Sequence, residues 1–298
     1  MPLAPEIEAM LKTINLQPPM HQTPIAELRK TRERIGATDF QPVGSVVDDA
    51  IPGPGGPIPV RRYAPERQEA ALPLVVFFHG GGFVFGSVDG YYDHVCRVIC
   101  SRANCEVVSV AYRLAPEHKF PAAIDDGVAA VQWAFEHGSR IIVAGGSAGA
   151  NLAAATALRV RDAGGAALRG QVLFYPLTDY HTPPTPSSLA YANGYYLTRA
   201  DVVWFWNQYL RSEDEAHSPY AAPLRAATLA GLPPALIITA EYDPLRDEGE
   251  RYAQRLRDEG VPLTLSRYAG MIHGFMAFPT PKASTALQEG AAWIRRNI

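Results

Sequence analysis

The stretch Val143-Ala144-Gly145-Gly146-Ser147-Ala148-Gly149-Ala150-Asn151 decides the fold of this chain. The apolar residues just before it predict a short buried strand, and the alanine-rich run after Asn151 predicts a helix. Between them, a Gly-x-Ser-x-Gly pattern places Ser147 at the apex of a sharp turn. Glycine is needed on both sides because larger side chains would crowd so tight a turn. The context predicts an exposed, nucleophilic serine on a strand–turn–helix unit.

Strands alternate with helices on both sides of this unit. The expected strands are Leu74–Phe78, Glu106–Ala111, Arg140–Ala144, Gln171–Tyr175, Ala235–Ala240 and Leu263–Tyr268. The expected helices are Val88–Arg102, Ala122–Glu136, Asn151–Ala163, Arg246–Glu259 and Ala283–Asn297. An antiparallel hairpin over residues 45–51 and 58–63 precedes them. The pattern is typical of an α/β fold, with a mostly parallel sheet covered by helices on both faces.

Two segments fall outside this alternation. The first 45 residues show an amphipathic helix over residues 3–14 and a second helix with Thr23 as its N-cap and Gly36 beyond its end. About sixty residues separate Tyr175 from Ala235, too many for a structureless loop, so an inserted helical cap is expected. The expected division is cap helices over 1–45, a first core part over 46–180, an inserted cap segment over 181–225 and a second core part over 226–298.

Aromatic side chains are concentrated in and around the expected cap. Four of them are candidates for lining a substrate pocket, namely Phe83, Tyr195, Tyr196 and Phe205. The alternative is that these aromatic side chains only pack the cap onto the core.

Composition and charge exclude several classes of function. A formal net charge of −3 and a pI near 6.2 argue against binding to nucleic acid or to an anionic membrane surface. The three cysteines form no Cys-x-x-Cys pair, which favours buried free thiols in a reducing cytoplasm. No apolar run predicts a signal peptide or a membrane span, so a cytoplasmic location is expected.

No cofactor or metal is expected. The glycines that follow His79 do not form Gly-x-Gly-x-x-Gly, and the chain contains no Walker sequence. Histidines and carboxylates also lack the spacing that metal sites require.

A serine nucleophile needs a base, and the base needs an orienting acid. Of the eight histidines, only His273 lies in a loop just after the last expected strand, where it could reach Ser147. Two aspartates are candidates for the acid that orients His273. Asp243 follows the strand that ends at Ala240, and Asp179 follows the strand that ends at Tyr175. Asp243 is favoured because it preserves the chain order Ser, Asp, His.

An acyl-transfer site must also stabilise negative charge on the carbonyl oxygen. The run His79-Gly80-Gly81-Gly82 follows the strand Leu74–Phe78 directly, so backbone N–H groups can point into a cavity there. Gly81 and Gly82, together with the N–H of Ala148, are the expected oxyanion donors. His79 itself is expected to brace this loop rather than to react.

Five motifs, in this order, resemble the bacterial hormone-sensitive-lipase-like esterases of the α/β-hydrolase fold. They are His79-Gly-Gly-Gly-Phe83, Tyr112-Arg-Leu-Ala-Pro-Glu117 with Phe120-Pro-Ala122, Gly145-Gly-Ser-Ala-Gly149, Asp243-Pro-Leu-Arg-Asp247 and His273-Gly-Phe275. The resemblance covers the chain from about residue 45 onward. It implies hydrolysis of short- to medium-chain carboxylic esters through an acyl-enzyme, without a cofactor, by Ser147, Asp243 and His273.

The family commonly has an acid immediately before the nucleophile, and this chain has Gly146 there. This position is not part of a triad, so the departure bears on the neighbourhood of Ser147 and not on its role. Two other functions stay open, namely a related acyl hydrolase (deacetylase, amidase or lactonase) and a non-catalytic hydrolase-like binding protein. The expected partner is a small-molecule ester, and the expected state is a monomer or a homodimer, in which the strand Leu263–Tyr268 could pair across the sheet edge.

Overall fold

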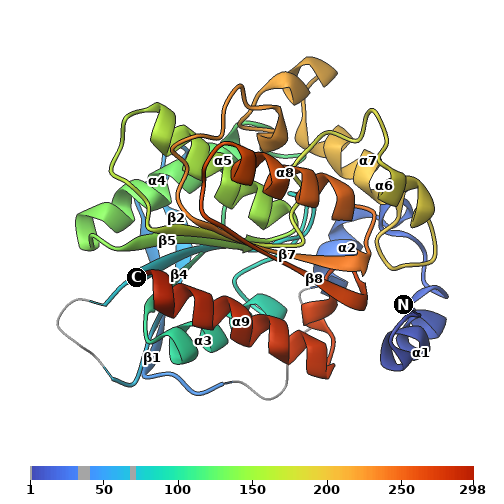
Figure 1. Cartoon of the computed structure of the whole chain (residues 1–298), viewed down its shortest axis with the longest axis horizontal. Coiled ribbons are helices and arrows are strands. Elements are labelled where there is room, and N and C mark those ends of the chain that lie inside the picture. The colour runs from blue at the N-terminus through green and yellow to red at the C-terminus, as the bar shows by residue number, and fades with distance from the viewer. Residues whose placement is uncertain (1, 33–40, 68–71) are drawn as a thin grey trace.

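The computed structural model describes residues 2–32, 41–67 and 72–298, and its centre is one eight-stranded sheet (Figure 1). The strand order is β1-β2-β4-β3-β5-β6-β7-β8. Strands β1 and β2 pair antiparallel with each other, and β2 pairs antiparallel with β4, whereas every other neighbouring pair is parallel. The strands are β1 (Ser45–Ile51), β2 (Ile58–Ala64), β3 (Leu74–Phe78), β4 (Glu106–Val110), β5 (Ile141–Gly146), β6 (Gly170–Phe174), β7 (Ala235–Tyr242) and β8 (Leu263–Ile272). The predicted α/β class is confirmed.

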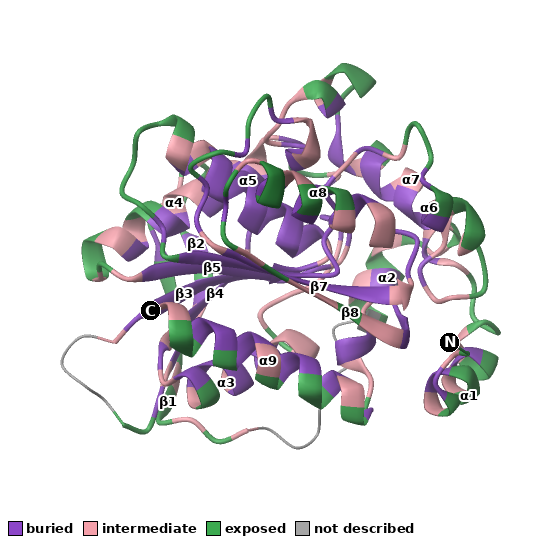
Figure 2. Cartoon of the chain, in the orientation of Figure 1, coloured by how far each residue is buried: buried purple, intermediate pink, exposed green. Residues whose placement is uncertain are grey.

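Helices cover both faces of the sheet (Figure 1). One face carries α3 (Tyr91–Ala103) and α9 (Pro281–Asn297), and the other carries α4 (Ala122–His137), α5 (Ala148–Asp162) and α8 (Arg246–Asp258). The central strands are buried throughout, as the colouring in Figure 2 shows. Along β3, Val75 and Phe77 belong to the core on the α3/α9 face, while Val76 and Phe78 belong to the opposite core. This alternation follows from the two-residue period of a strand, and burial on both faces explains the continuous apolar runs in the sequence.

Two boundaries differ from the sequence-based expectation in places that matter for the site. Strand β5 extends through Gly146, because Gly145 still pairs with β3 and Gly146 still pairs with β6, and α5 begins at Ala148 rather than at Asn151. Strand β8 extends to Ile272, which pairs with Tyr242 after a register shift in β7. His273 therefore follows the last strand immediately, without the four-residue lead that the sequence suggested.

The segments expected to form a cap do not all lie together. Those labelled at the right of Figure 1 lie beyond one end of the sheet, whereas the 3₁₀ turn Pro223–Arg225 packs against α5 and α8. The expected cap segments comprise α1 (Pro5–Ile14), the 3₁₀ turn η1 (Met20–Gln22), α2 (Ile25–Arg32), α6 (Pro186–Ala190), α7 (Arg199–Tyr209) and the 3₁₀ turns η2 (Glu213–His217) and η3 (Pro223–Arg225). A further 3₁₀ turn, η4 (Phe275–Ala277), follows β8. The expected end of the second helix at Gly36 lies outside the described residues. The division of the chain into cap and core segments stays a prediction.

Helix α7 is held between the N-terminal segment and the core. Thr198 and Asp201 form a capping box at its start, which satisfies N–H groups that the first turn leaves unpaired. Asp201 is fully buried and also accepts bonds from the backbone N–H and the Nδ1 of His21, both at 2.8 Å. This contact ties η1 of the N-terminal segment to α7 of the insertion.

Two further expectations concern the chain as a whole. Cys96, Cys100 and Cys105 are free and buried, as predicted. Among the described residues, no helix combines the length and the apolar character that crossing a membrane requires.

Candidate active site

Ser147 lies on the turn between β5 and α5 with an unusual backbone conformation, φ 57° and ψ −120°. A non-glycine residue with positive φ costs free energy and is retained where surrounding structure enforces it. The two flanking glycines allow the close approach that enforces it here. A Cβ on Gly145 would lie 2.3 Å from the Gly149 carbonyl oxygen, and a Cβ on Gly149 would lie 2.0 Å from the Phe78 carbonyl oxygen. The turn therefore has the geometry predicted from its sequence.

Ser147, His273 and Asp243 form one hydrogen-bonded chain. His273 Nε2 lies 2.9 Å from Ser147 Oγ, and His273 Nδ1 lies 2.8 Å from Asp243 Oδ2. His273 and Asp243 are both buried, and the backbone N–H of Leu245 donates to the second carboxylate oxygen of Asp243 at 2.8 Å. Because a carboxylate only accepts hydrogen bonds, Nδ1 carries the proton and Nε2 is left free to accept one from the serine.

The parallel sheet explains why these residues meet. Ser147 follows β5, Asp243 follows β7 and His273 follows β8, and all three strands run in the same direction. Their carboxyl ends lie at one edge of the sheet, so residues far apart in the chain converge there.

Asp179, the other candidate acid, forms an ion pair with Arg225 rather than a contact with His273. Its carboxylate pairs with the Arg225 guanidinium at 2.6 Å and accepts the Tyr180 N–H at 2.8 Å. The backbone N–H groups of Thr178 and Asp179 donate to the buried Glu248 carboxyl group, which fixes the conformation of this loop. Burial raises the pKa of Glu248 well above its ordinary value.

The predicted oxyanion loop lies beside Ser147. Gly80, Gly81 and Gly82 line the same pocket as Ser147. The Gly81 carbonyl accepts the N–H groups of Val84 and Phe85, both at 3.0 Å, so the loop folds into a turn with positive φ at both Gly81 and Gly82. Ala148 is the first residue of α5, which places its N–H at a helix N-terminus, where the helix dipole favours negative charge.

Comparison with known proteins gives a consistent result. A family model described as alpha/beta hydrolase fold matches residues 75–277. The chain is 46% identical to the carboxylic ester hydrolase LipN of Mycobacterium tuberculosis, over 78% of this chain and 64% of LipN, so it spans slightly less than two thirds of that relative. It is 42% identical to the esterase LipI of the same organism, over 90% of this chain and 88% of LipI. A solved hyperthermophilic esterase from the archaeon Pyrobaculum calidifontis superimposes with a TM-score of 0.94 at 42% identity, covering 99% of both chains.

The chain belongs to the α/β-hydrolase family.

The resemblance to the hormone-sensitive-lipase-like esterases of this family is confirmed by the named relatives. The structure also shows what surrounds the one departure of this α/β hydrolase from the family pattern. A Cβ on Gly146 would lie 3.3 Å from the Tyr175 ring and 3.4 Å from the Tyr92 hydroxyl, tighter than ordinary contacts. Both tyrosines are held in place, because Tyr175 packs edge-on against the His273 ring and Tyr92 is tilted against Phe77. A side chain before the nucleophile would require one or both rings to shift by a few tenths of an ångström.

The pocket of this α/β hydrolase contains two of the four aromatic side chains proposed for it. Tyr196 and Phe205 line the pocket next to Ser147 and His273. The structure places the other two elsewhere. Phe83 is fully buried and stacks on Tyr209 with ring centroids 3.8 Å apart, and Tyr195 stacks on Tyr242. For these two, the alternative of plain packing describes what is observed.

Several residues that line the pocket were not predicted from the sequence. Met20, Tyr92, Tyr175 and Leu197 also line the pocket. No local pattern marks them, because each lies in an ordinary helical, strand-end or loop context and reaches the pocket only through tertiary packing. The one available signal was the proximity of Tyr175 to the end of a strand, since residues at that end of the sheet gather around the site.

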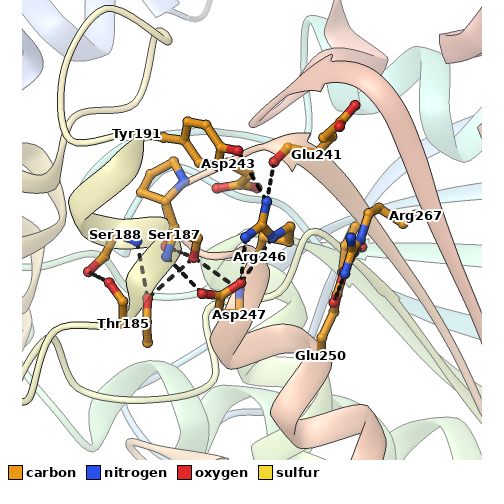
Figure 3. A network of polar contacts seen from close by, with 12 residues as sticks. Thr185, Ser187, Ser188, Tyr191, Glu241, Asp243, Arg246, Asp247, Glu250 and Arg267 are labelled. Atoms are coloured by element: carbon orange, nitrogen blue, oxygen red, sulfur yellow. Dashed lines mark hydrogen bonds and ion pairs between the residues drawn. The ribbon is translucent and has the colours of Figure 1, made fainter. Parts of the chain in front are cut away.

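A polar network holds the segment that carries Asp243 (Figure 3). Asp247 accepts the Ser187 backbone N–H at 2.7 Å and the Arg246 guanidinium at 2.9 Å, and the Ser187 hydroxyl donates to the Pro244 carbonyl at 3.1 Å. Burial alone would raise the pKa of Asp247, but these donors hold it below its ordinary value. Asp247 thus pairs at the start of α8, and α6 is tied to the residue that follows Asp243.

His79 braces the oxyanion loop. Its Nδ1 donates to the Gly80 carbonyl at 2.8 Å, its ring stacks on Tyr112, and its own carbonyl accepts the Tyr112 hydroxyl at 2.7 Å. Burial lowers the pKa of His79 from 6.5 to about 4. The folded protein therefore holds His79 neutral at pH values where the unfolded chain would protonate it.

This difference predicts a pH-dependent loss of stability. Between pH 6.5 and about 4 the unfolded state binds a proton that the native state does not, so stability falls as the pH falls. Across this pH range the free energy of unfolding falls by about 3 kcal/mol, because the pKa of His79 is about 4 in the folded protein and 6.5 in the unfolded chain. Urea unfolding at pH 7, 6, 5 and 4 should show a steeper decline for the wild-type protein than for His79→Asn, which cannot take up the proton. Parallel declines would contradict the prediction, because all other titrating groups are common to both proteins.

Proposed function

We propose that this protein hydrolyses short- to medium-chain carboxylic esters through an acyl-enzyme formed on Ser147. His273 Nε2 accepts the serine proton as Oγ attacks the acyl carbon, and then delivers it to the leaving alcohol. Asp243 keeps His273 in the tautomer that leaves Nε2 free, and it stabilises the imidazolium that forms. Water then enters, and the same histidine activates it to release the acid.

One observation carries this proposal. Ser147 Oγ, the His273 ring and the Asp243 carboxylate are joined by hydrogen bonds of 2.9 and 2.8 Å at the wall of a pocket. Nucleophile, base and orienting acid within hydrogen-bonding reach of one another are the requirement for covalent acyl transfer. No metal or cofactor has a part in these steps.

The surroundings of Ser147 support the same chemistry. Gly81, Gly82 and Ala148 are proposed to donate their N–H groups to the oxyanion. Gly81 and Gly82 line the same pocket as Ser147, and Ala148 follows Ser147 directly. Each such donor accounts for roughly a hundredfold or more in rate. Ester hydrolysis is also the activity in the names of the relatives, which supports the same proposal for this chain.

The size of the pocket bears on the substrate. Its volume is about 110 Å³, below the 300–1,000 Å³ of ordinary ligand pockets. This small space favours short acyl groups. A monomeric or homodimeric state and a cytoplasmic location remain predictions from the sequence.

Two measurements on the wild-type protein test the proposal. Hydrolysis of p-nitrophenyl esters from acetate to decanoate is expected to show the highest kcat/KM at short chains, with a fall of roughly tenfold or more for the longest, because each unaccommodated methylene costs about 1 kcal/mol or more. An organophosphonate is expected to label Ser147 and no other residue, as peptide mass spectrometry would show. Absent labelling of the folded protein, together with absent ester hydrolysis, would overturn the proposal.

A further inference from the structure

A second cavity adjoins the catalytic pocket on the cap side. Its volume is about 580 Å³, and it lies between the segment from Ile14 to Thr31 and the loop that includes Asn193, Tyr196 and Thr198. We call it the cap groove. Met20 and Tyr196 line both the cap groove and the catalytic pocket, and no other described residue does. These two side chains therefore separate a small reactive space from a larger one.

We propose that the cap groove binds the alcohol portion of the ester substrate, and that Met20 with Tyr196 controls access to it. This inference rests on the proposed function and names the substrate class in more detail. The catalytic pocket by itself is smaller than ordinary ligand pockets, whereas the two cavities joined would fall within their range.

The position of Tyr196 indicates that the alcohol portion of the ester, and not its acyl portion, lies in the cap groove. The leaving alcohol receives its proton from His273 Nε2 and so departs on the His273 side of the site. Gly274 follows His273 directly, and a Cβ built on Gly274 would lie 3.6 Å from the Tyr196 ring. Tyr196 thus covers the leaving-group side, and a group that passes it enters the cap groove. Phe205, by contrast, packs over Gly82 on the oxyanion side.

Hydrogen bonds at Met20 and His21 fix the backbone here, so a change at Met20 has to come from the rotamer of its side chain. The Met20 carbonyl accepts the Thr23 N–H at 3.1 Å, and the next residue, His21, makes two 2.8 Å bonds to the buried Asp201 of α7. The Met20 side chain is buried, at 4% exposure. With three rotatable bonds and a polarisable sulfur, methionine fills irregular space and can change its rotamer at little cost.

The lining of the cap groove indicates the chemistry of the group it accepts. The lining is mixed. Its amide and hydroxyl side chains are those of Asn15, Gln17, Gln22, Thr23, Thr31, Asn193 and Thr198, and its apolar side chains are those of Ile14, Pro18, Pro19, Met20, Pro24 and Leu28. Glu27 is the one charged residue among the described lining residues. Such a surface suits a neutral alcohol that combines an apolar framework with several hydrogen-bonding oxygens, and the described lining residues offer no cation to an anionic group.

The first test compares alcohols at constant acyl group. The probes are ethyl acetate and the acetate of triethylene glycol monomethyl ether, and the readout is the ratio of their kcat/KM values in a pH-stat. Met20→Ala is expected to raise the ratio of the glycol ester to ethyl acetate about tenfold, a magnitude typical of a pocket that gains room for one group. Met20→Leu keeps the bulk, so its ratio should stay within about twofold of wild type.

The second test fills the groove itself. Gln17 is exposed, so Gln17→Trp should fold and occupy part of the groove. It is expected to lower the same ratio about threefold or more, in the wild-type and in the Met20→Ala background. Glu8→Trp, on an exposed face of α1 outside the groove, is the matched control and should leave the ratio unchanged.

The outcomes separate this inference from the proposed function. If ethyl acetate is hydrolysed but neither Met20→Ala nor Gln17→Trp moves the alcohol ratio, the cap groove does not bind the alcohol and only this inference falls. If Met20→Ala instead changes the ratio of ethyl hexanoate to ethyl acetate and leaves the alcohol ratio unchanged, the groove receives the acyl chain and the assignment is overturned. If no ester is hydrolysed and no phosphonate reacts, both proposals fall together.

Discussion

Replacing Ser147 with alanine is expected to lower kcat for p-nitrophenyl acetate by about 10⁴- to 10⁶-fold, because no acyl-enzyme can form without the attacking Oγ. The residual rate should come from the oxyanion donors and from substrate binding, which still operate on water. Steady-state kinetics on purified protein measures the loss. The same variant should no longer be labelled by an organophosphonate.

The variant should remain folded, because alanine adds no atom to the turn and the flanking glycines keep their close contacts. Its thermal unfolding midpoint is the check on this point. Ser139→Ala is the matched control, because Ser139 is exposed and lies just before the start of β5, whereas Ser147 follows the end of that strand. The kcat of this variant should equal that of the wild type. A Ser147→Ala protein with activity within tenfold of wild type would show that the nucleophile is another residue.

Replacing Asp243 with asparagine is expected to lower kcat by about 10⁴-fold. The amide can donate a hydrogen bond to Nδ1 of His273, which stabilises the tautomer that carries its proton on Nε2. Such a histidine cannot accept the serine proton, although the overall geometry is kept. The buried imidazolium of the transition state also loses the carboxylate 2.8 Å away that would stabilise it.

Asp179→Asn is the comparison that decides between the two acids. It removes the charge that pairs with Arg225 and leaves the bonds among Ser147, His273 and Asp243 intact. We expect it to reduce stability by about 1 kcal/mol, as for a partly exposed ion pair, and to change kcat by less than about tenfold. Urea unfolding and steady-state kinetics on both variants provide the two readouts. A greater loss of kcat at Asp179 than at Asp243 would show that the acid has been assigned incorrectly.

Much of the candidate site could be predicted from sequence because the motifs are local. Gly145, Ser147 and Gly149 lie within five positions, and the same five residues set the backbone of the turn. The position of His273 after the last strand and of the glycines after His79 follows from the parallel sheet, whose strands all end at one edge.

The choice between Asp243 and Asp179 depends on contacts that the sequence does not display. Both follow strands that end at the same edge of the sheet. Arg225 and Glu248, which hold Asp179 and its loop, are 46 and 69 positions away in the chain. Their approach is a property of the folded chain, and chain order favoured Asp243 without explaining why the other acid is unavailable.

For the apolar side chains of the pocket too, the sequence predicts less than the folded structure shows. Phe83 and Tyr196 are both aromatic residues near predicted site loops, yet one is buried beneath α7 and the other faces Ser147. Aromatic composition predicts burial, but the direction of a side chain in a loop depends on which element packs over it. Gly146 is another case, since only the tertiary structure shows that a side chain there would press on Tyr92 and Tyr175.

The sequence by itself determined the α/β class, the strand–turn–helix unit around Ser147 and the order of the strands that carry the polar site residues, because periodicity and glycine spacing act over a few residues. Only the tertiary structure decided which side chains enclose the reactive space. Met20 reaches that space from the N-terminal segment, through a backbone held to α7 by His21 and Asp201, which are 180 positions apart. Contacts between such distant segments depend on the packing of whole elements, and no local pattern records them.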